Sequence, residues 1–178
     1  VSSPRGSLVH GSGFLFDLTE APRQPFGKDA GGALFASVGE SAAAAEGQSR
    51  AGVWLRLREL VEEARLYRKN PRAVESGKSR PLGLSPEHLR SLIAALAGEV
   101  PLALFAHRES DVRAALRFKR ELEAAGDRAR LILLGAEEAW AAADELARER
   151  VPVVLSPSQQ HPAHFETLRA RDDAAAIL

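Results

Sequence analysis

The chain has 178 residues, and its 24 Lys and Arg residues are balanced by 24 Asp and Glu residues. A net charge of zero argues against general nucleic-acid binding and against attachment to an acidic membrane surface. The absence of Cys excludes disulfide scaffolds, thiolate zinc sites and cysteine nucleophiles. No apolar run reaches the ~18 residues of a membrane helix. The chain starts at Val1 and contains no Met, so we expect an internal fragment of a longer protein.

The first part of the chain predicts two short strands and one long helix. The strands are expected over 13–18 and 33–38, on either side of a loop rich in Pro and Gly. An alanine-rich connection over 41–47 leads to a helix that begins near Gln48 and ends near Lys69, before Asn70-Pro71. Within it, Val53, Leu57 and Leu60 lie on one apolar stripe of helical period. The basic segment 65–80 is expected to be a solvated loop.

The rest of the chain alternates apolar runs with helical patterns. Ser85 is a predicted N-cap and Pro86 a first helical residue, and Gly98 closes that helix. The runs 100–106, 130–134 and 151–155 predict strands buried on both faces, with helices over 110–125 and 137–148 between them. This alternation predicts an α/β fold with parallel strands, as in a (β/α) barrel or a doubly wound sheet. Neither a dinucleotide-binding glycine fingerprint nor a P-loop is present.

Ligands in such folds bind at the carboxyl ends of the strands, which singles out residues after each apolar run. His107 is a candidate metal ligand or general base, with capping of the next helix as the alternative. Arg108 could bind a carboxylate or phosphate through both of its terminal nitrogens, although pairing with the acids that follow it is favoured. Glu137 is a candidate acid or base, but a place in the first turn of a helix also explains it. Gln160 follows the third run and is a candidate substrate-binding residue.

The remaining histidines carry weaker predictions. His161 and His164 would share a face if they were helical and could then hold a metal, but Pro162 between them favours a loop or first turn. His10 and His88 are expected at the surface. Trp54 and Trp140 fall on predicted helices and are expected to pack rather than to stack on a ligand.

Four stretches together carry a family resemblance: 100–116, 131–140, 151–157 and 165–175. Their series resembles the amidohydrolase superfamily, in its imidazolonepropionase-like branch, and the resemblance extends more weakly over 11–69. It implies a partial (β/α)8 TIM-type barrel with parallel strands. Residues 1–178 would then be the middle portion of that barrel, without its first and last strands.

The resemblance also implies a chemistry and a ligand set. Enzymes of this family hold one or two divalent metals, with zinc the metal expected, and water attacks the C–N bond of an amide or cyclic amide. His107 matches the metal ligand that follows the fifth strand. The second histidine is missing, because Leu134 precedes Gly135, and the His-x-His pair has no counterpart. The last aspartate would lie beyond Leu178.

The partner implied is a small-molecule amide or peptide-like substrate, bound by Arg108, Glu137 and Gln160, with no nucleic acid and no membrane. No catalytic residue is assigned. Relatives in this branch are often exported, so the resemblance points to a periplasmic or secreted protein.

Two functional hypotheses remain open. His107 favours a fragment of a metal-dependent amidohydrolase, such as a dipeptidase-like or cyclic-amide hydrolase. Leu134 favours a catalytically inactive barrel that binds or scaffolds. For the chain alone we expect no tight zinc binding, because plausible ligands are too few. We also expect self-association through open sheet edges and through an uncovered Val53–Leu57–Leu60 stripe. Finally, we expect nearly inaccessible side chains at the strand positions Leu102, Leu104, Leu133 and Val153.

Overall fold

One five-stranded sheet organises the chain, in the spatial order β1-β2-β3-β4-β5. The computed structural model describes residues 8–13, 32–45, 49–78, 80–156, 158, 160–163 and 165–178. Its strands are β1 (Val9–Ser12), β2 (Leu34–Ser37), β3 (Leu102–Phe105), β4 (Leu131–Leu134) and β5 (Val153–Val154). Strands β2 to β5 are parallel, and β1 runs antiparallel to β2. The predicted α/β class with parallel strands is therefore confirmed.

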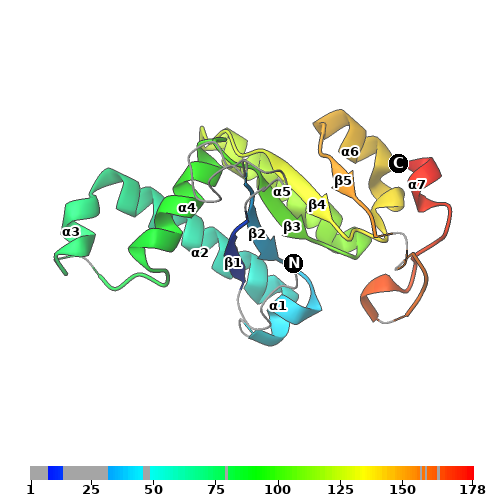
Figure 1. Cartoon of the computed structure of the whole chain (residues 1–178), viewed down its shortest axis with the longest axis horizontal. Coiled ribbons are helices and arrows are strands. Elements are labelled where there is room, and N and C mark those ends of the chain that lie inside the picture. Colours follow the sequence, from blue (N-terminus) through cyan, green and yellow to red (C-terminus); the bar gives the residue numbers. More distant parts are fainter. Residues whose placement is uncertain are drawn as a thin grey trace, which may run out of the picture.

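Helices connect the parallel strands and cover the sheet. They are α1 (Glu40–Ala45), α2 (Arg50–Lys69), α3 (Pro71–Glu75), α4 (Pro86–Leu96), α5 (Glu109–Ala124), α6 (Ala143–Glu149) and α7 (Ala174–Ile177), with 3-10 turns η1 (Ala139–Ala142) and η3 (Phe165–Thr167). In Figure 1, α2 and α5 run behind the strands. No helix within the described ranges is long and apolar enough to cross a membrane.

Side chains cap the starts of α2, α3 and α4. Ser49 caps α2 by accepting a hydrogen bond from the Gly52 backbone N–H at 2.9 Å. Asn70 ends α2 and caps α3 through the Ala73 N–H at 3.2 Å. Ser85 caps α4 with Pro86 as its first residue, as the sequence predicts. Two helices differ from expectation: α1 occupies part of the expected alanine-rich connection, and α3 part of the expected solvated loop.

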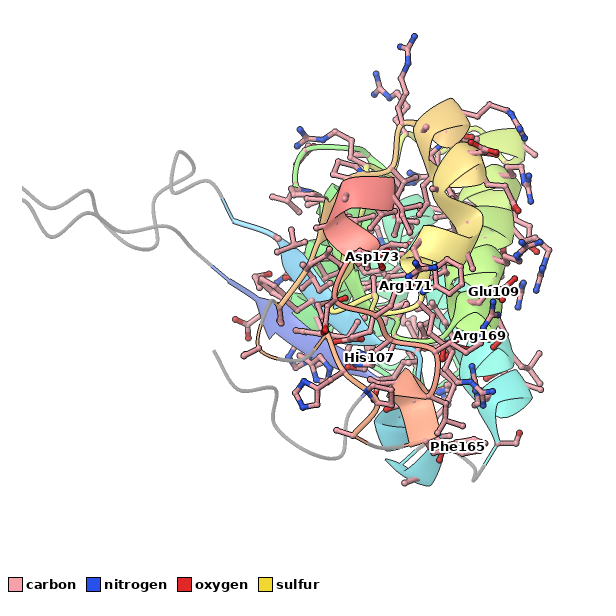
Figure 2. The ribbon with its side chains drawn as sticks, turned by 90° about the vertical axis from the view of Figure 1, so that its right-hand side faces the viewer. His107, Glu109, Phe165, Arg169, Arg171 and Asp173 are labelled. Atoms are coloured by element: carbon pink, nitrogen blue, oxygen red, sulfur yellow. The ribbon has the colours of Figure 1, made fainter. Side chains whose placement is uncertain are left out.

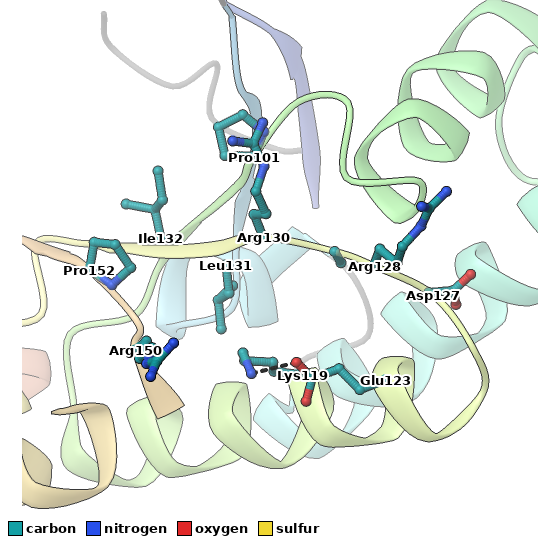
Figure 3. Close-up of a pocket in the computed structure, with 11 residues that line it drawn as sticks. Pro101, Lys119, Glu123, Asp127, Arg128, Arg130, Leu131, Ile132, Arg150 and Pro152 are labelled. Atoms are coloured by element: carbon teal, nitrogen blue, oxygen red, sulfur yellow. Dashed lines mark hydrogen bonds and ion pairs between the residues drawn. The ribbon is translucent and has the colours of Figure 1, made fainter. Parts of the chain in front are cut away.

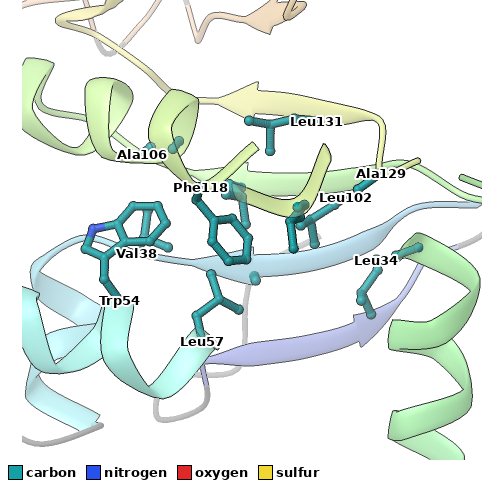
Figure 4. Close-up of a cluster of buried hydrophobic side chains, with 14 of the residues drawn as sticks. Leu34, Val38, Trp54, Leu57, Leu102, Ala106, Phe118, Ala129 and Leu131 are labelled. Carbon is teal, nitrogen blue, oxygen red and sulfur yellow. The ribbon is translucent and has the colours of Figure 1, made fainter. Parts of the chain in front are cut away.

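Alternation along the strands places one leucine-rich row against the helices. Across neighbouring strands, Leu34, Leu102 and Leu131 lie opposite one another, as do Ala36, Leu104 and Leu133. All six side chains are buried. Phe118 of α5 and Trp54 of α2 pack on this row, with ring centroids 5.8 Å apart (Figure 4). The burial predicted for Leu102, Leu104 and Leu133 is confirmed.

Strand β5 is not the strand buried on both faces that its apolar run predicts. Val153 is only half-buried and Val154 is 54% exposed. Within the described residues, β5 is the last strand of the sheet and pairs only with β4. It therefore has no further strand beside it whose side chains would cover Val153 and Val154. An apolar run favours burial of the strand, but whether the strand is buried depends on the strands and helices that pack against it in the folded chain.

The expectation of an uncovered stripe on the long helix is also wrong. Val53, Leu57 and Leu60 are all at most 2% exposed. They lie in the same hydrophobic cluster as the buried faces of α4 and α5, which covers them without further strands. The predicted strand over 13–18 lies outside the described residues except for Gly13, while β1 was not predicted.

Candidate active site at the carboxyl end of the sheet

An imidazole–carboxylate pair lies where β3 and β4 end. His107 follows β3 by two residues, and Glu137 follows β4 by three. The Nδ1 atom of His107 is 2.6 Å from Oε2 of Glu137. The Glu137 side chain is fully buried, and that of His107 is 22% exposed. The two residues that sequence reasoning selected separately therefore form one unit, although they are thirty residues apart in the chain.

Gly135 makes room for this pair. Its φ is +76°, a left-handed conformation that favours glycine. A Cβ atom at this position would lie 2.6 Å from Cε1 and 2.7 Å from Nδ1 of His107. The turn after β4 thus brings Glu137 under the imidazole only because residue 135 lacks a side chain.

The surroundings favour the protonated imidazole. Burial alone lowers the pKa of His107. The hydrogen bond and charge of Glu137, helped by the charges of Glu166 and Asp111, outweigh burial and raise the pKa above its ordinary value of 6.5. Asp111 is itself buried, and burial raises its pKa in spite of its ion pair with Arg50.

Glu137 is not in the first turn of a helix, which corrects the alternative explanation for it. The segment after β4 first turns through Ala136, at φ +50°, and helical structure begins only at Ala139. Helix geometry therefore gives no reason for a carboxylate at position 137. The hydrogen-bonding contact between Glu137 and His107 does explain a carboxylate at this position.

The next residue, Glu138, fixes the backbone around the pair. Its buried carboxylate accepts the Glu109 N–H at 3.0 Å and the Arg169 N–H at 3.1 Å. Its own N–H donates to the His107 carbonyl at 3.0 Å. Because Arg108 provides no side-chain cap for α5, Glu138 takes that role from another strand end. Sequence reasoning missed Glu138, since its partners are distant in the chain.

A C-terminal strap, defined here as residues 165–173, lies against these strand ends. Arg169 forms an ion pair with Glu109, and both are labelled in Figure 2. The carbonyl of Arg169 accepts the Trp140 indole N–H at 2.9 Å. The guanidinium carbons of Arg169 and Arg171 lie 5.0 and 4.8 Å from the Trp140 ring centre. Trp140 therefore stacks on protein arginines, which differs from simple packing in a helix.

The other end of the strap approaches β2 and β3. Glu166 accepts the Glu40 backbone N–H at 2.5 Å, shortly after β2. Phe165 lies beneath Arg108, whose guanidinium carbon is 4.6 Å from the ring centre. The strap thereby connects the ends of β2, β3 and β4, and it brings the Glu166 charge toward His107.

Unmet hydrogen-bonding capacity is concentrated at this end. Within the described residues, the buried side-chain atoms without a hydrogen bond are Arg108 Nε, Asp111 Oδ2, Arg113 Nε, Glu137 Oε1 and both amide atoms of Gln160. All belong to the loops after β4 and β5, or to the start of α5 and the residue before it. Asp111 Oδ2 is in an ion pair with Arg50. Buried polar atoms are normally satisfied, so such a concentration is a mark of a ligand or solvent site.

The structure separates the predicted site residues into two groups. His107, Glu137, Arg108 and Gln160 lie at the carboxyl end, with Gln160 only 6% exposed. His161 is exposed, and His164 lies outside the described residues. His88 is exposed as expected, whereas His10 is half-buried and lies 2.7 Å from the Ser37 hydroxyl. Arg108 does not form the predicted ion pair, since Asp111 pairs with Arg50 and Glu109 with Arg113 and Arg169.

The donor set fits one position of a metal site. Glu137 at Nδ1 leaves Nε2 of His107 as the nitrogen that could bind a metal, an arrangement in which a carboxylate orients the imidazole. A catalytic zinc takes about three protein ligands. Among the described residues, no group of three His, Asp or Glu side chains is placed to hold one. The described part of the chain therefore offers a single ligand.

A cleft of about 620 Å³ lies at the opposite end of the strands (Figure 3). Its charged lining residues are Lys119, Glu123, Asp127, Arg128, Arg130 and Arg150. Lys119 is paired with Glu123 and Glu149, and Figure 3 shows Arg128 and Arg130 pointing away from Arg150. These groups do not converge on one point, and active sites of barrels lie at the other end, so the cleft is not the candidate site.

Comparisons with known proteins agree with the barrel. No protein-family model matches the chain, and no curated protein matches its sequence significantly. The crystal structure of an amidohydrolase from Thermotoga maritima MSB8 is similar, with a TM-score of 0.75 and 19% sequence identity. The match covers 98% of this chain and 45% of the length of that structure. Over the part that it spans, the chain therefore has the α/β fold of a partial TIM-type barrel.

Proposed function

We propose that the protein is a hydrolase of C–N bonds in small amides or peptide-like molecules, and that the carboxyl end of the sheet is its active site. The observation that carries the proposal is the buried His107–Glu137 pair at the mouth of an amidohydrolase-like barrel. The sequence resemblance to the imidazolonepropionase-like branch supports the same reaction class.

We further propose a divalent metal, zinc in the first place, with His107 as the ligand that the described residues supply. When bound, such a metal lowers the pKa of a water toward ~7 and so provides hydroxide at neutral pH. The remaining ligands would have to come from residues that the structure does not describe. Accordingly we expect no tight zinc binding by the 178-residue chain alone, because one imidazole is too few.

The chain's own residues have distinct roles in this proposal. Glu137 holds the imidazole plane through Nδ1 and stabilises positive charge on it. Glu138 fixes the backbone on both sides of the site by accepting two N–H groups from separate segments. Gln160, buried with an unpaired amide, is available to accept from and donate to an amide group of a substrate.

The test is hydrolysis by the product of the complete gene. Wild type and a His107→Gln variant are assayed on N-acyl amino acids, dipeptides and cyclic amides, with and without a chelator. We expect hydrolysis of at least one class, and a loss of at least about a hundredfold in kcat/KM in the variant. His88→Gln, at an exposed histidine, is the matched control. Full activity of His107→Gln would overturn the site. Inactivity of the wild type on every class would favour a barrel that binds without catalysis.

A further inference from the structure

Arg108 carries a positive charge at this end that acts on Asp111 only at a distance and forms no ion pair within the described residues. Its neighbours in the chain are acidic, yet each acid is committed elsewhere. Asp111 pairs with Arg50, and Glu109 pairs with Arg113 and Arg169. Arg108 itself forms no ion pair among the described side chains, and its Nε atom is buried without a hydrogen bond.

The guanidinium is held by an aromatic ring and not by an ion pair with a described carboxylate. Its carbon lies 4.6 Å from the centre of the Phe165 ring. Stacking on an aromatic face restricts the guanidinium plane and leaves its edge N–H groups free to donate. Phe165 belongs to the C-terminal strap, which Glu138 and Trp140 anchor through Arg169. A surface arginine that served solubility alone would need neither a buried Nε nor an anchored platform.

The position of Arg108 relates it to the reacting group. It directly follows His107, and the peptide between them is fixed because Glu138 donates to the His107 carbonyl. It also stands at the N-terminus of α5, a helix of sixteen residues, whose dipole adds to the positive potential. Arg108 and the candidate imidazole therefore stand at the same edge of the sheet, on consecutive residues.

We propose that Arg108 is a specificity residue that binds a carboxylate of the amide substrate, so that N-acyl amino acids and dipeptides are preferred over neutral amides. A planar guanidinium binds a carboxylate through two parallel N–H donors. A neutral carboxamide carries no negative charge to pair with the guanidinium. This inference rests on the proposed function for its reaction, and on the geometry of Arg108 and Phe165 for its ligand.

A binding experiment on the 178-residue chain tests it. N-acetylglycine and its uncharged counterpart N-acetylglycinamide are titrated separately into each protein by isothermal calorimetry, and in the proteins that keep the arginine the Arg108 Nε–H signal is followed by NMR. We expect the acid to bind about tenfold or more tightly than the amide, as a charge-assisted hydrogen bond would give. In Arg108→Gln the two ligands should bind equally. Phe165→Leu, which keeps the arginine but removes its platform, should weaken binding of the acid alone.

The controls separate recognition from folding and from general charge. Arg72→Gln removes one charge from an exposed residue of α3 and should leave the preference for the acid unchanged. Circular dichroism shows whether each variant is folded. Equal binding of acid and amide to wild type, a preference that survives in Arg108→Gln, or no response of the Nε–H to either ligand would overturn the proposal. Stronger binding of inorganic phosphate than of N-acetylglycine would overturn the assignment to a carboxylate.

A kinetic experiment on the product of the complete gene distinguishes this inference from the proposed function. There, Arg108→Gln should raise KM for the acid substrate by about tenfold or more and leave KM for the carboxamide unchanged. Hydrolysis of acid and carboxamide with equal KM by wild type would overturn the role of Arg108 while leaving the hydrolase intact. A carboxylate preference in binding without any hydrolysis would overturn the hydrolase while leaving the role of Arg108 intact.

Discussion

Replacing Glu137 by Gln should lower the pKa of His107 and weaken the fold in a way that depends on pH. The substitution keeps the size of the side chain and a hydrogen-bond acceptor, but it removes the charge 2.6 Å from Nδ1. In the wild type, the hydrogen bond and charge of Glu137, together with the charges of Glu166 and Asp111, outweigh the effect of burial on the imidazole. Without that charge, burial is opposed only by the weaker influences of Glu166 and Asp111, and the pKa of His107 should fall below its wild-type value.

The size of the effect follows from the burial of both partners. Glu137 is fully buried and His107 is 22% exposed, so solvent screens the pair little. A hydrogen bond to a charged group contributes about 1.5–3 kcal/mol. We expect Glu137→Gln to lower the free energy of unfolding by about that amount where His107 is protonated.

The direction with pH is fixed by linkage. The pKa of His107 is raised in the folded state, so its contribution to stability is fully present below the unfolded pKa of about 6.5 and is lost as pH rises through the folded pKa. The difference between wild type and Glu137→Gln should therefore be largest in mildly acidic solution and shrink in alkaline solution.

Two measurements check this prediction. An NMR titration of the His107 ring proton gives its pKa in each protein, and urea unfolding at several pH values gives the stabilities. Glu59→Gln is the matched control, because Glu59 forms a half-exposed ion pair with Arg56 on one helix. It should change the free energy of unfolding by less than about 1 kcal/mol. An unchanged His107 pKa in Glu137→Gln, or a stability difference that grows with pH, would refute the reasoning.

Three further predictions concern the sheet that holds the site. Leu133→Ala, at a fully buried position, should lower the free energy of unfolding in urea by ~2–5 kcal/mol, and Val154→Ala at the exposed edge should lower it far less. Similar losses in the two variants would contradict the observed difference in burial between these two side chains. Gly135→Ala should destabilise the chain and shift the His107 ring signals by NMR, since both its φ of +76° and the imidazole oppose a Cβ; an unperturbed His107 would show that the turn adapts. We propose that the chain self-associates through the outer edge of β5. Val154→Lys should then reduce the apparent mass measured by light scattering. A wild-type chain that is already monomeric would disprove the self-association.

Much of the architecture was readable from local patterns. The apolar runs that became β3 and β4 are flanked by helices, and Ser85-Pro86 marks the start of α4 where it is observed. These features depend on neighbouring residues, so sequence spacing reports them. The burial of Leu104 and Leu133 followed for the same reason, because parallel strands between helices require it.

Features that depend on distant neighbours were not readable. Val154 has the composition of a core residue but lies at an edge, and nothing local distinguishes the two cases. Leu57 is the converse case, because it was expected to be uncovered and is buried in the cluster that α4 and α5 share with it. Helix capping by Glu138 joins three segments, so it emerges only from the folded chain.

The candidate site was half predictable. The rule that ligands lie at strand carboxyl ends selected His107, Arg108, Glu137 and Gln160 without a motif. It did not pair His107 with Glu137, because that contact depends on the turn at Gly135. It also could not show that Arg108 avoids its acidic neighbours, since their partners come from α2 and the C-terminal strap.

A crystal structure of the complete gene product with N-acetylglycine bound would test the central claim most directly. The account predicts ligand density at the carboxyl end of the sheet, with the carboxylate on Arg108 and a ligand atom or ordered water on Glu137 Oε1 and the Gln160 amide. Those are buried groups that lack hydrogen bonds within the described residues. Density elsewhere, with these atoms satisfied by protein groups alone, would contradict it.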